Sequence, residues 1–128
     1  MLRNSKAFSS YSVNDLSRAK AFYATVLGLE VKDNEMGLIE LHLTGGTTVM
    51  IYPKPNHVPA TFTVLNFPVA DLEKQVAELK SAGVVFESYQ EESLTTGDDN
   101  IFRGGGPKIA WFTDPAGNIL SVVEQLPA

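Results

Sequence analysis

Glu40 and His42 are the residues of this chain best placed for acid–base chemistry. They stand two positions apart in the apolar stretch "LIELHL". Side chains two positions apart on a strand share a face and lie about 7 Å from each other. Glu40 could therefore orient His42 as a general base. A polar pair at a sheet edge or a subunit contact is the alternative, and the pattern leaves both readings open.

A second group of residues has the chemistry to hold a ligand rather than to react with it. Tyr52 and Asn66 place polar groups on apolar strands, and the alternation of "IAWFT" puts Trp111 on the same face as Ile109. Arg103 precedes three glycines in an irregular stretch, 91–108, and could clamp a carboxylate or phosphate group. Core packing, or a mobile loop without a ligand, would explain the same residues. We expect His57, in the proline-rich "YPKPNHVPA", to be an exposed residue without a role.

Composition excludes several classes of function. Ten basic and fifteen acidic residues give a formal charge of −5 without a basic cluster, so we expect no nucleic-acid or membrane partner. The absence of cysteine excludes disulfides, thiolate zinc sites and cysteine nucleophiles. The N-terminus lacks the apolar core of a signal peptide, and no stretch approaches the roughly 20 apolar residues of a membrane span. A cytoplasmic protein is expected.

A divergent internal repeat indicates how these residues are positioned. Residues 12–31 and 68–86 share one pattern: Asp15 or Asp71 as a helix N-cap, a helix of about three turns, and Gly28 or Gly83 as its stop. One strand is expected before each helix and three after it. The expected strands are 6–13, 29–34, 37–44 and 47–53, then 61–69, 84–89, 108–113 and 118–125.

The order βαβββ thus occurs twice in one domain, 1–128. Module one covers about 6–53, the linker 54–60, and module two about 61–126. We expect an α+β fold whose eight strands form a cupped sheet with the helices on its outer face. Alternation places three sets on the helix-packed face: Ile39, Leu41 and Leu43; Thr63, Leu65, Phe67 and Val69; Leu120 and Val122.

The stretches "VNDLSRAKAFYATVLGLEV" and "WFTDPAGNILSVVE", on two βαβββ modules, resemble the vicinal oxygen chelate superfamily. This superfamily includes glyoxalase I, extradiol dioxygenases, fosfomycin-resistance enzymes and bleomycin-resistance proteins. The resemblance covers nearly the whole chain, and the stretch from Tyr52 to Val69 resembles a bacterial glyoxalase-like subgroup. It implies a homodimer and a small-molecule ligand. Because the superfamily hosts many chemistries, the resemblance specifies the fold better than the function.

The resemblance also implies where a metal would be held. Metal-using members place His, Gln or Glu on four strands of the cup, and the motifs carry these positions onto Phe8, Val64 and Ser121, with the fourth at Met50 or, one residue on, Ile51. Phe and Val have no donor atom, and Met and Ser suit a hard divalent ion poorly. We therefore expect no metal and no other cofactor. Glu40, His42 and Glu124 are the only candidate ligands for a metal site at other positions. Alternation puts Glu124 on the face opposite the one that carries Glu40 and His42.

Two classes of function follow. The first is a metal-independent protein that binds an apolar or aromatic molecule in the cup. The second is a small isomerase or lyase, with or without a divalent metal, in which Glu40 and His42 are catalytic. The sequence does not decide whether the protein is an enzyme, and it leaves the ligand and the role of 91–108 open. The predicted ligand-binding residues are Phe8, Met50, Tyr52, Phe62, Val64, Asn66, Arg103, Trp111 and Ser121.

Overall fold

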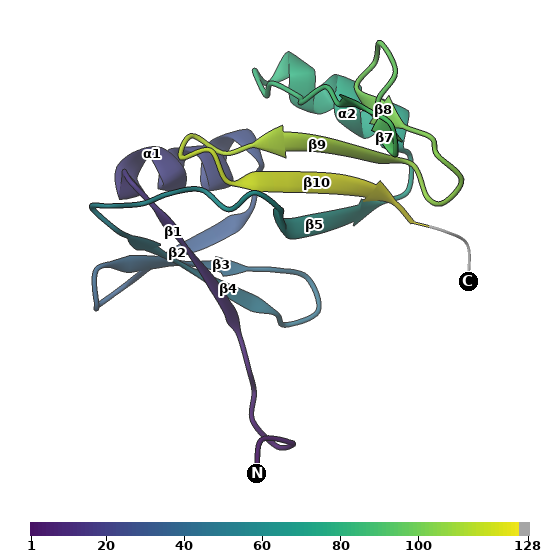
Figure 1. The fold of residues 1–128 in the computed structure, drawn as a ribbon. Helices are drawn as coiled ribbons and strands as arrows, with labels where there is room; N and C mark the ends of the chain where they lie inside the picture. Colours follow the sequence, from purple (N-terminus) through teal and green to yellow (C-terminus); the bar gives the residue numbers. More distant parts are fainter. Residues whose placement is uncertain (126–128) are drawn as a thin grey trace. The chain divides into compact units, whose positions relative to one another are not determined.

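The chain divides between Val58 and Pro59, inside the expected linker, and each of the two units has its own sheet and helix. The computed structural model describes residues 1–125 of the 128-residue chain. The expected end of module two, at residue 126, lies outside the described residues. Together the units form the predicted α+β fold of two βαβββ modules, with two four-stranded sheets that are not closed (Figure 1).

The first unit, Met1–Val58, contains a sheet in the order β1-β4-β3-β2. The parallel pair β1–β4 joins the ends of the module, and the other pairs are antiparallel. Its elements are β1 (Ser9–Val13), α1 (Leu16–Ala21), the π-helical turn η1 (Phe22–Val26), β2 (Glu30–Asn34), β3 (Leu38–His42) and β4 (Thr48–Pro53).

Nearby residues account for the start of the first helix and accompany its change from α-helical to π-helical geometry. The Asp15 side chain accepts a hydrogen bond from the backbone N–H of Arg18 at 3.1 Å, as an N-cap does. The predicted three-turn helix is α-helical only to Ala21 and then widens into η1. Tyr23, inside the widened turn, is fully buried, and its hydroxyl accepts a hydrogen bond from Tyr11 of β1 at 2.7 Å. Gly28, with φ +71°, ends the helix, as its position in the sequence predicts.

Burial follows the period of two along the strands of this sheet. On β3, Ile39 and Leu41 are buried, whereas Leu38, Glu40 and His42 are partly exposed. On β4, Val49 and Ile51 are buried, and Met50 between them is partly exposed. Helix α1 contacts both β3 and β4, so the expected face assignment is confirmed for Ile39 and Leu41. Of the two registers left open on β4, Met50 is the residue that faces away from the helix.

The second unit, Pro59–Ala128, contains a sheet in the order β5-β10-β9-β8 and a separate two-stranded hairpin. Here β5 is parallel to β10, and the other pairs of the sheet are antiparallel. Its elements are β5 (Thr63–Val69), α2 (Leu72–Ser81), the hairpin of β6 (Gln90–Glu91) and β7 (Leu94–Thr95), β8 (Ile101–Phe102), β9 (Ile109–Thr113) and β10 (Ile119–Glu124).

Helix α2 covers one face of this sheet through contacts with β9 and β10 (Figure 1). Asp71 caps its start by accepting from the N–H of Lys74 at 3.1 Å, and Gly83, with φ +94°, follows its end. The buried helix residues and the buried alternate strand residues form the core: Leu72, Val76, Leu79, Ala110, Phe112, Leu120 and Val122.

The structure corrects two expectations in this unit. The expected strand 84–89 is reduced to an isolated bridge between Phe86 and Phe112, and the fourth strand is β8, from within the stretch expected to be irregular. A β-bulge also shifts the register, because Ile119 pairs with Thr63 whereas Leu120 pairs with Leu65. The extra residue, Val64, breaks the alternation. Thr63 therefore lies on the face opposite α2, not on the helix-packed face where alternation alone placed it.

Within residues 1–125, none of the helices combines the length and the apolar character needed to cross a membrane.

Candidate functional site

The face of the first sheet that lies away from α1 has an apolar part on β1 and β4. Met50 and Tyr52 of β4 point to this side, next to the hydroxyls of Ser10 and Ser12 on β1. Phe8 immediately precedes β1 and falls on the same side by alternation. Its side chain is 66% exposed and that of Tyr52 is 38% exposed. Two predicted ligand-binding aromatic residues are therefore left unpacked within a unit whose other face is buried.

The same face has a polar part on β2 and β3. The Nε2 atom of His42 lies 2.8 Å from the Oε1 atom of Glu40, and the Asn34 side-chain amide donates to the Oε2 atom of Glu40 at 2.7 Å. The predicted pair is thus in direct contact despite its separation along the strand. Asn34, which the sequence analysis did not consider, holds the second carboxylate oxygen. Asn34 is the last residue of β2, and its side chain also accepts from the N–H of Met36 in the turn that follows. The sequence around it gave no signal of its contact with Glu40.

These contacts set the charge of Glu40. The hydrogen bond from Asn34 lowers the pKa of Glu40, the bond to His42 lowers it further, and partial burial opposes both effects. An ionised carboxylate can only accept, so the bond to His42 requires the proton on Nε2. Nδ1 is then the basic nitrogen. The arrangement has the geometry of an oriented imidazole base, with its protonated nitrogen fixed by a carboxylate.

His57 is not the isolated linker residue that we expected. Its Nδ1 atom lies 2.7 Å from the hydroxyl oxygen of Ser12, and its ring is only partly exposed. The backbone N–H of His57 also closes a turn onto the carbonyl of Lys54. The linker therefore folds back onto β1 on the side where Ser10 and Met50 lie. Nothing in the sequence pairs position 12 with position 57.

The face of the second sheet opposite α2 is organised around Trp111. The indole N–H of Trp111 donates to the Thr63 hydroxyl at 3.1 Å. Ser121, directly opposite Trp111 in the β9–β10 pair, is fully buried and donates its hydroxyl proton to the Asn66 amide oxygen. The bulge at Val64 brings Thr63 to this face, and without it the indole would lose this acceptor. Phe62, just before β5, is 67% exposed.

Two further rings flank Trp111. Tyr89 makes an edge-to-face contact with it at 5.3 Å between ring centroids, and Phe102 a tilted contact at 6.1 Å. Burial raises the pKa of Tyr89, and the Glu87 and Glu91 carboxylates raise it further, so the phenol stays neutral. Both rings come from the segment between α2 and β9. The sequence analysis assigned no role to either.

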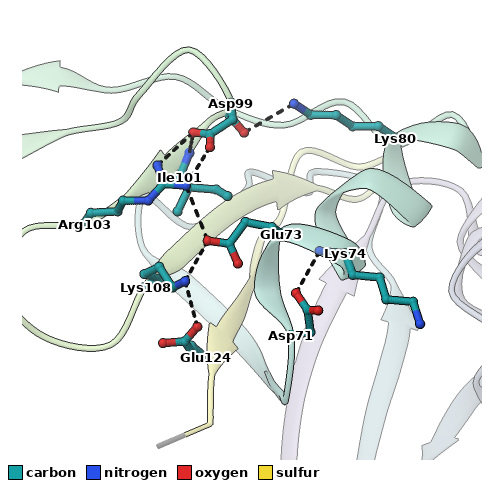
Figure 2. A network of polar contacts seen from close by, with 9 residues as sticks. All are labelled: Asp71, Glu73, Lys74, Lys80, Asp99, Ile101, Arg103, Lys108 and Glu124. Carbon is teal, nitrogen blue, oxygen red and sulfur yellow. Dashed lines mark hydrogen bonds and ion pairs between the residues drawn. The ribbon is translucent and has the colours of Figure 1, made fainter.

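Arg103, predicted to clamp an anionic group, is engaged by acidic side chains of its own unit (Figure 2). Both terminal nitrogens contact Asp99, at 3.2 and 2.7 Å, and one also reaches Glu73 of α2 at 3.5 Å. These carboxylates raise the pKa of Arg103. An anionic ligand would have to exchange with Asp99 or Glu73. The clamp therefore stays a prediction that requires this exchange.

A chain of ion pairs continues from Arg103 to the sheet. Lys108, before β9, contacts Glu73 at 2.6 Å and Glu124 of β10 at 3.0 Å. The bond from Lys108 lowers the pKa of Glu73, and the same bond raises the pKa of Lys108. Figure 2 shows Glu73 between Lys108 and Arg103. The network links α2, β10 and the segment 99–108, and it occupies the Glu124 carboxylate that a different metal site would need.

The donor set does not fit a metal of the kind that the family's metal enzymes hold. In the described residues 1–125, no three His, Cys, Asp or Glu side chains gather as a metal site requires. The four positions that the resemblance assigns to ligands carry Phe8, Met50, Val64 and Ser121. The Ser121 hydroxyl is turned to Asn66. No step of a reaction is therefore derived through a metal.

The chain belongs to the Glyoxalase/Bleomycin resistance protein/Dioxygenase superfamily, whose sequence profile matches residues 8–122. A search of curated protein sequences finds no match. Many solved structures share the fold. The antibiotic-binding protein TnmS3 from Streptomyces sp. CB03234 is 19% identical over 96% of this chain and 98% of its own, with a TM-score of 0.68.

Two other relatives have different described roles. A glyoxalase family protein from Enterococcus faecalis is 24% identical over 97% of this chain and 100% of its own, with a TM-score of 0.66. The fosfomycin resistance protein FosX from Listeria monocytogenes is 14% identical over 94% of this chain and 92% of its own, with a TM-score of 0.68. At these identities the likeness establishes the fold alone.

Removing the Asn34 amide should raise the pKa of Glu40. In Asn34→Ala the largest of the effects that lower it is lost, and the Glu40 titration should move up toward its ordinary value of 4.5. Side-chain carboxyl NMR measures this pKa directly, with Asn56→Ala in the linker as the control.

The depressed pKa of Glu40 also makes the stability of the fold depend on pH. Because the folded-state pKa is lower than the unfolded one, the stability that Glu40 contributes is present above its unfolded pKa and is lost as pH falls through the folded value. An unchanged Glu40 titration in Asn34→Ala would contradict this account.

Proposed function

We propose that this protein binds a small apolar or aromatic molecule without a metal. The observation that carries the proposal is the exposure of Phe8, Tyr52 and Phe62, three aromatic residues predicted to bind ligand. Exposed aromatic groups on an otherwise packed unit are typical of binding surfaces. Phe8 and Tyr52 share one face of the first sheet, and Phe62 belongs to the second unit. The proposed contacts from the first unit are Phe8, Met50 and Tyr52. Those from the second unit are Phe62, Val64, Asn66, Trp111 and Ser121, with Arg103 for an anionic group.

Several observations support this proposal. TnmS3, which shares the fold, is described as an antibiotic-binding protein, and FosX is described as a fosfomycin resistance protein. The positions that would hold a metal are occupied mostly by apolar side chains, which suit an apolar ligand. We also propose that the protein is cytoplasmic, in keeping with its acidic composition and the lack of cysteine.

A second candidate function is favoured by one contact, the 2.8 Å bond between Glu40 and His42. An imidazole oriented in this way can move a proton in an isomerase or a lyase. The two functions differ in the fate of the ligand. A binding protein returns a candidate ligand unchanged after long incubation, whereas an enzyme converts it. Conversion that is abolished by His42→Ala would establish catalysis, and NMR of the small molecule reads out either result.

Truncating Phe8 should weaken the binding of an apolar probe. Loss of about 1 kcal/mol of apolar contact corresponds to roughly fivefold weaker binding of the neutral dye Nile red to Phe8→Ala. The free energy of unfolding should change by less than about 0.5 kcal/mol because the side chain is largely exposed. Met36→Ala is the matched control, since Met36 is 77% exposed and lies in the turn before β3. Equal dye affinities in the two variants would refute the assignment of Phe8.

Metal should be neither retained nor needed. We expect purified, dialysed protein to carry far less than one equivalent of zinc, nickel, manganese or iron by elemental analysis. EDTA should leave the Tm unchanged, because no metal-binding free energy is coupled to folding. Ser121→Glu restores one carboxylate at an implied ligand position and should still not bring metal with it. Stoichiometric metal that survives dialysis would overturn the metal-free proposal.

The protein should also assemble as a homodimer, as the resemblance implies. Neither four-stranded sheet is closed, so each has two edge strands. These are β1 and β2 in the first sheet and β5 and β8 in the second. Edge strands give a physical motive for pairing between copies. Sedimentation velocity at micromolar concentration should show a species of twice the 13.9 kDa chain mass. A single species at the chain mass would rule the dimer out at that concentration.

A further inference from the structure

A groove of about 510 Å³ lies in the segment between α2 and β9 of the second unit, and its lining includes no residue of β5. Its walls come from the hairpin of β6 and β7 and from residues 96–104. A volume of this size suits a drug-sized molecule. We propose that this groove is a separate binding site for a small aromatic cation. Its lining includes Glu92, Ser93, Thr95, Phe102 and Gly104. Arg103, proposed above for an anionic group, also lines this groove and is the one residue shared by the two proposals.

The walls of the groove are fixed by hydrogen bonds. The Thr96 hydroxyl accepts from the N–H of Tyr89 at 2.9 Å, and Gly97 donates its N–H to the carbonyl of Ile101 at 3.0 Å. Asn100 sits at the corner of this turn with φ +68°, a conformation that asparagine tolerates. Its side-chain amide donates to the Glu87 carbonyl at 3.2 Å and so ties the turn to the start of the segment. The groove is therefore formed before any ligand arrives.

Phe102 provides the aromatic wall, and Gly104 leaves the space that its ring occupies. The Phe102 ring lies where a Cβ atom on residue 104 would be, so only glycine fits beneath it. The same ring contacts Trp111 on the sheet. Glycine is required at positions 104 and 105 for different reasons. Gly104 makes room for the Phe102 ring, and Gly105 adopts φ +112°, a conformation that favours glycine.

The charges of the groove favour a cation. The guanidinium of Arg103 is already matched by Asp99 and Glu73. Among the contacts described for residues 1–125, Glu92 has no ion-pair partner, so its carboxylate is the uncompensated charge of the lining. A cation beside an aromatic face and a carboxylate gains from both. The hydroxyls of Ser93 and Thr95 add polar contacts. These features together define an aromatic cation as the ligand class.

Trp111 is the one tryptophan of the chain, so the protein's tryptophan fluorescence comes from this residue alone. Its ring contacts Phe102, which lines the groove, so a ligand that moves Phe102 should change this fluorescence. The test titrates phenyltrimethylammonium and, separately, benzenesulfonate, which present the same ring with opposite charge. We expect the cation to change Trp111 fluorescence saturably and to shift backbone NMR signals of residues 92–104. The anion should do neither. Glu92→Gln should weaken the cation at least threefold. Equal binding of both probes, or shifts confined to the sheet, would overturn the proposal.

Gly104 and Gly106, two positions apart, provide a matched pair of variants. Gly104→Ala forces the Phe102 ring out of its place and should weaken the cation at least tenfold, whereas a Cβ at Gly106 meets nothing within 4 Å. Gly106→Ala should therefore bind as the parent protein does. If Gly104→Ala is too unstable to assay, Phe102→Ala removes the same wall without a clash and should weaken binding equally. Equal affinities in Phe102→Ala and the parent would exclude the site. Nile red binding to the sheet faces should survive these changes, which separates a failure here from a failure of the proposed function.

Discussion

A four-stranded sheet with a single helix of its own can bury only one of its faces against that helix. In the first unit the buried face takes Ile39, Leu41, Val49 and Ile51, and in the second it takes Ala110, Phe112, Leu120 and Val122. The opposite faces are free of that packing constraint. Polar and aromatic groups such as Glu40, His42 and Trp111 can lie there without a cost to the core. The division between the buried core face and the face that carries the candidate site residues follows from the period of two along the strands.

Sequence patterns predicted whatever depends on this period and on local helix signals. The N-caps Asp15 and Asp71, the glycine stops and the facing of Glu40 and His42 are all local. What could not be predicted involves residues far apart in sequence. The bulge at Val64 arises from the pairing of β5 with β10. It moves the Thr63 side chain from the helix-packed face to the face opposite α2. Trp111 was found as a candidate, but its contacts with Tyr89 and Phe102 depend on a fold of the 87–108 segment that has no periodic pattern.

One of the positions that the resemblance assigns to a metal ligand has its polar group satisfied within the protein. Ser121 remains fully buried at the centre of its sheet, and its hydroxyl is satisfied by Asn66. A carboxylate at this position would need a cation or several donors to offset its desolvation. A serine–amide bond needs neither. The local interactions are thus complete without a metal, and this agrees with the apolar character of Phe8, Met50 and Val64.

The two modules differ most in how the chain returns from helix to edge strand. In the first, β2 begins two residues after Gly28, and the edge is formed at once. In the second, the chain passes through the β6–β7 hairpin and the Asn100 turn before β8 forms the corresponding edge. That longer path supplies both rings that flank Trp111, Tyr89 and Phe102, and its return to β9 is held by ion pairs to α2 and β10 (Figure 2). Because these ion pairs join exposed groups, each contributes little alone. The hydrogen-bonded turn and the fit of Phe102 over Gly104 therefore do more to fix the aromatic wall.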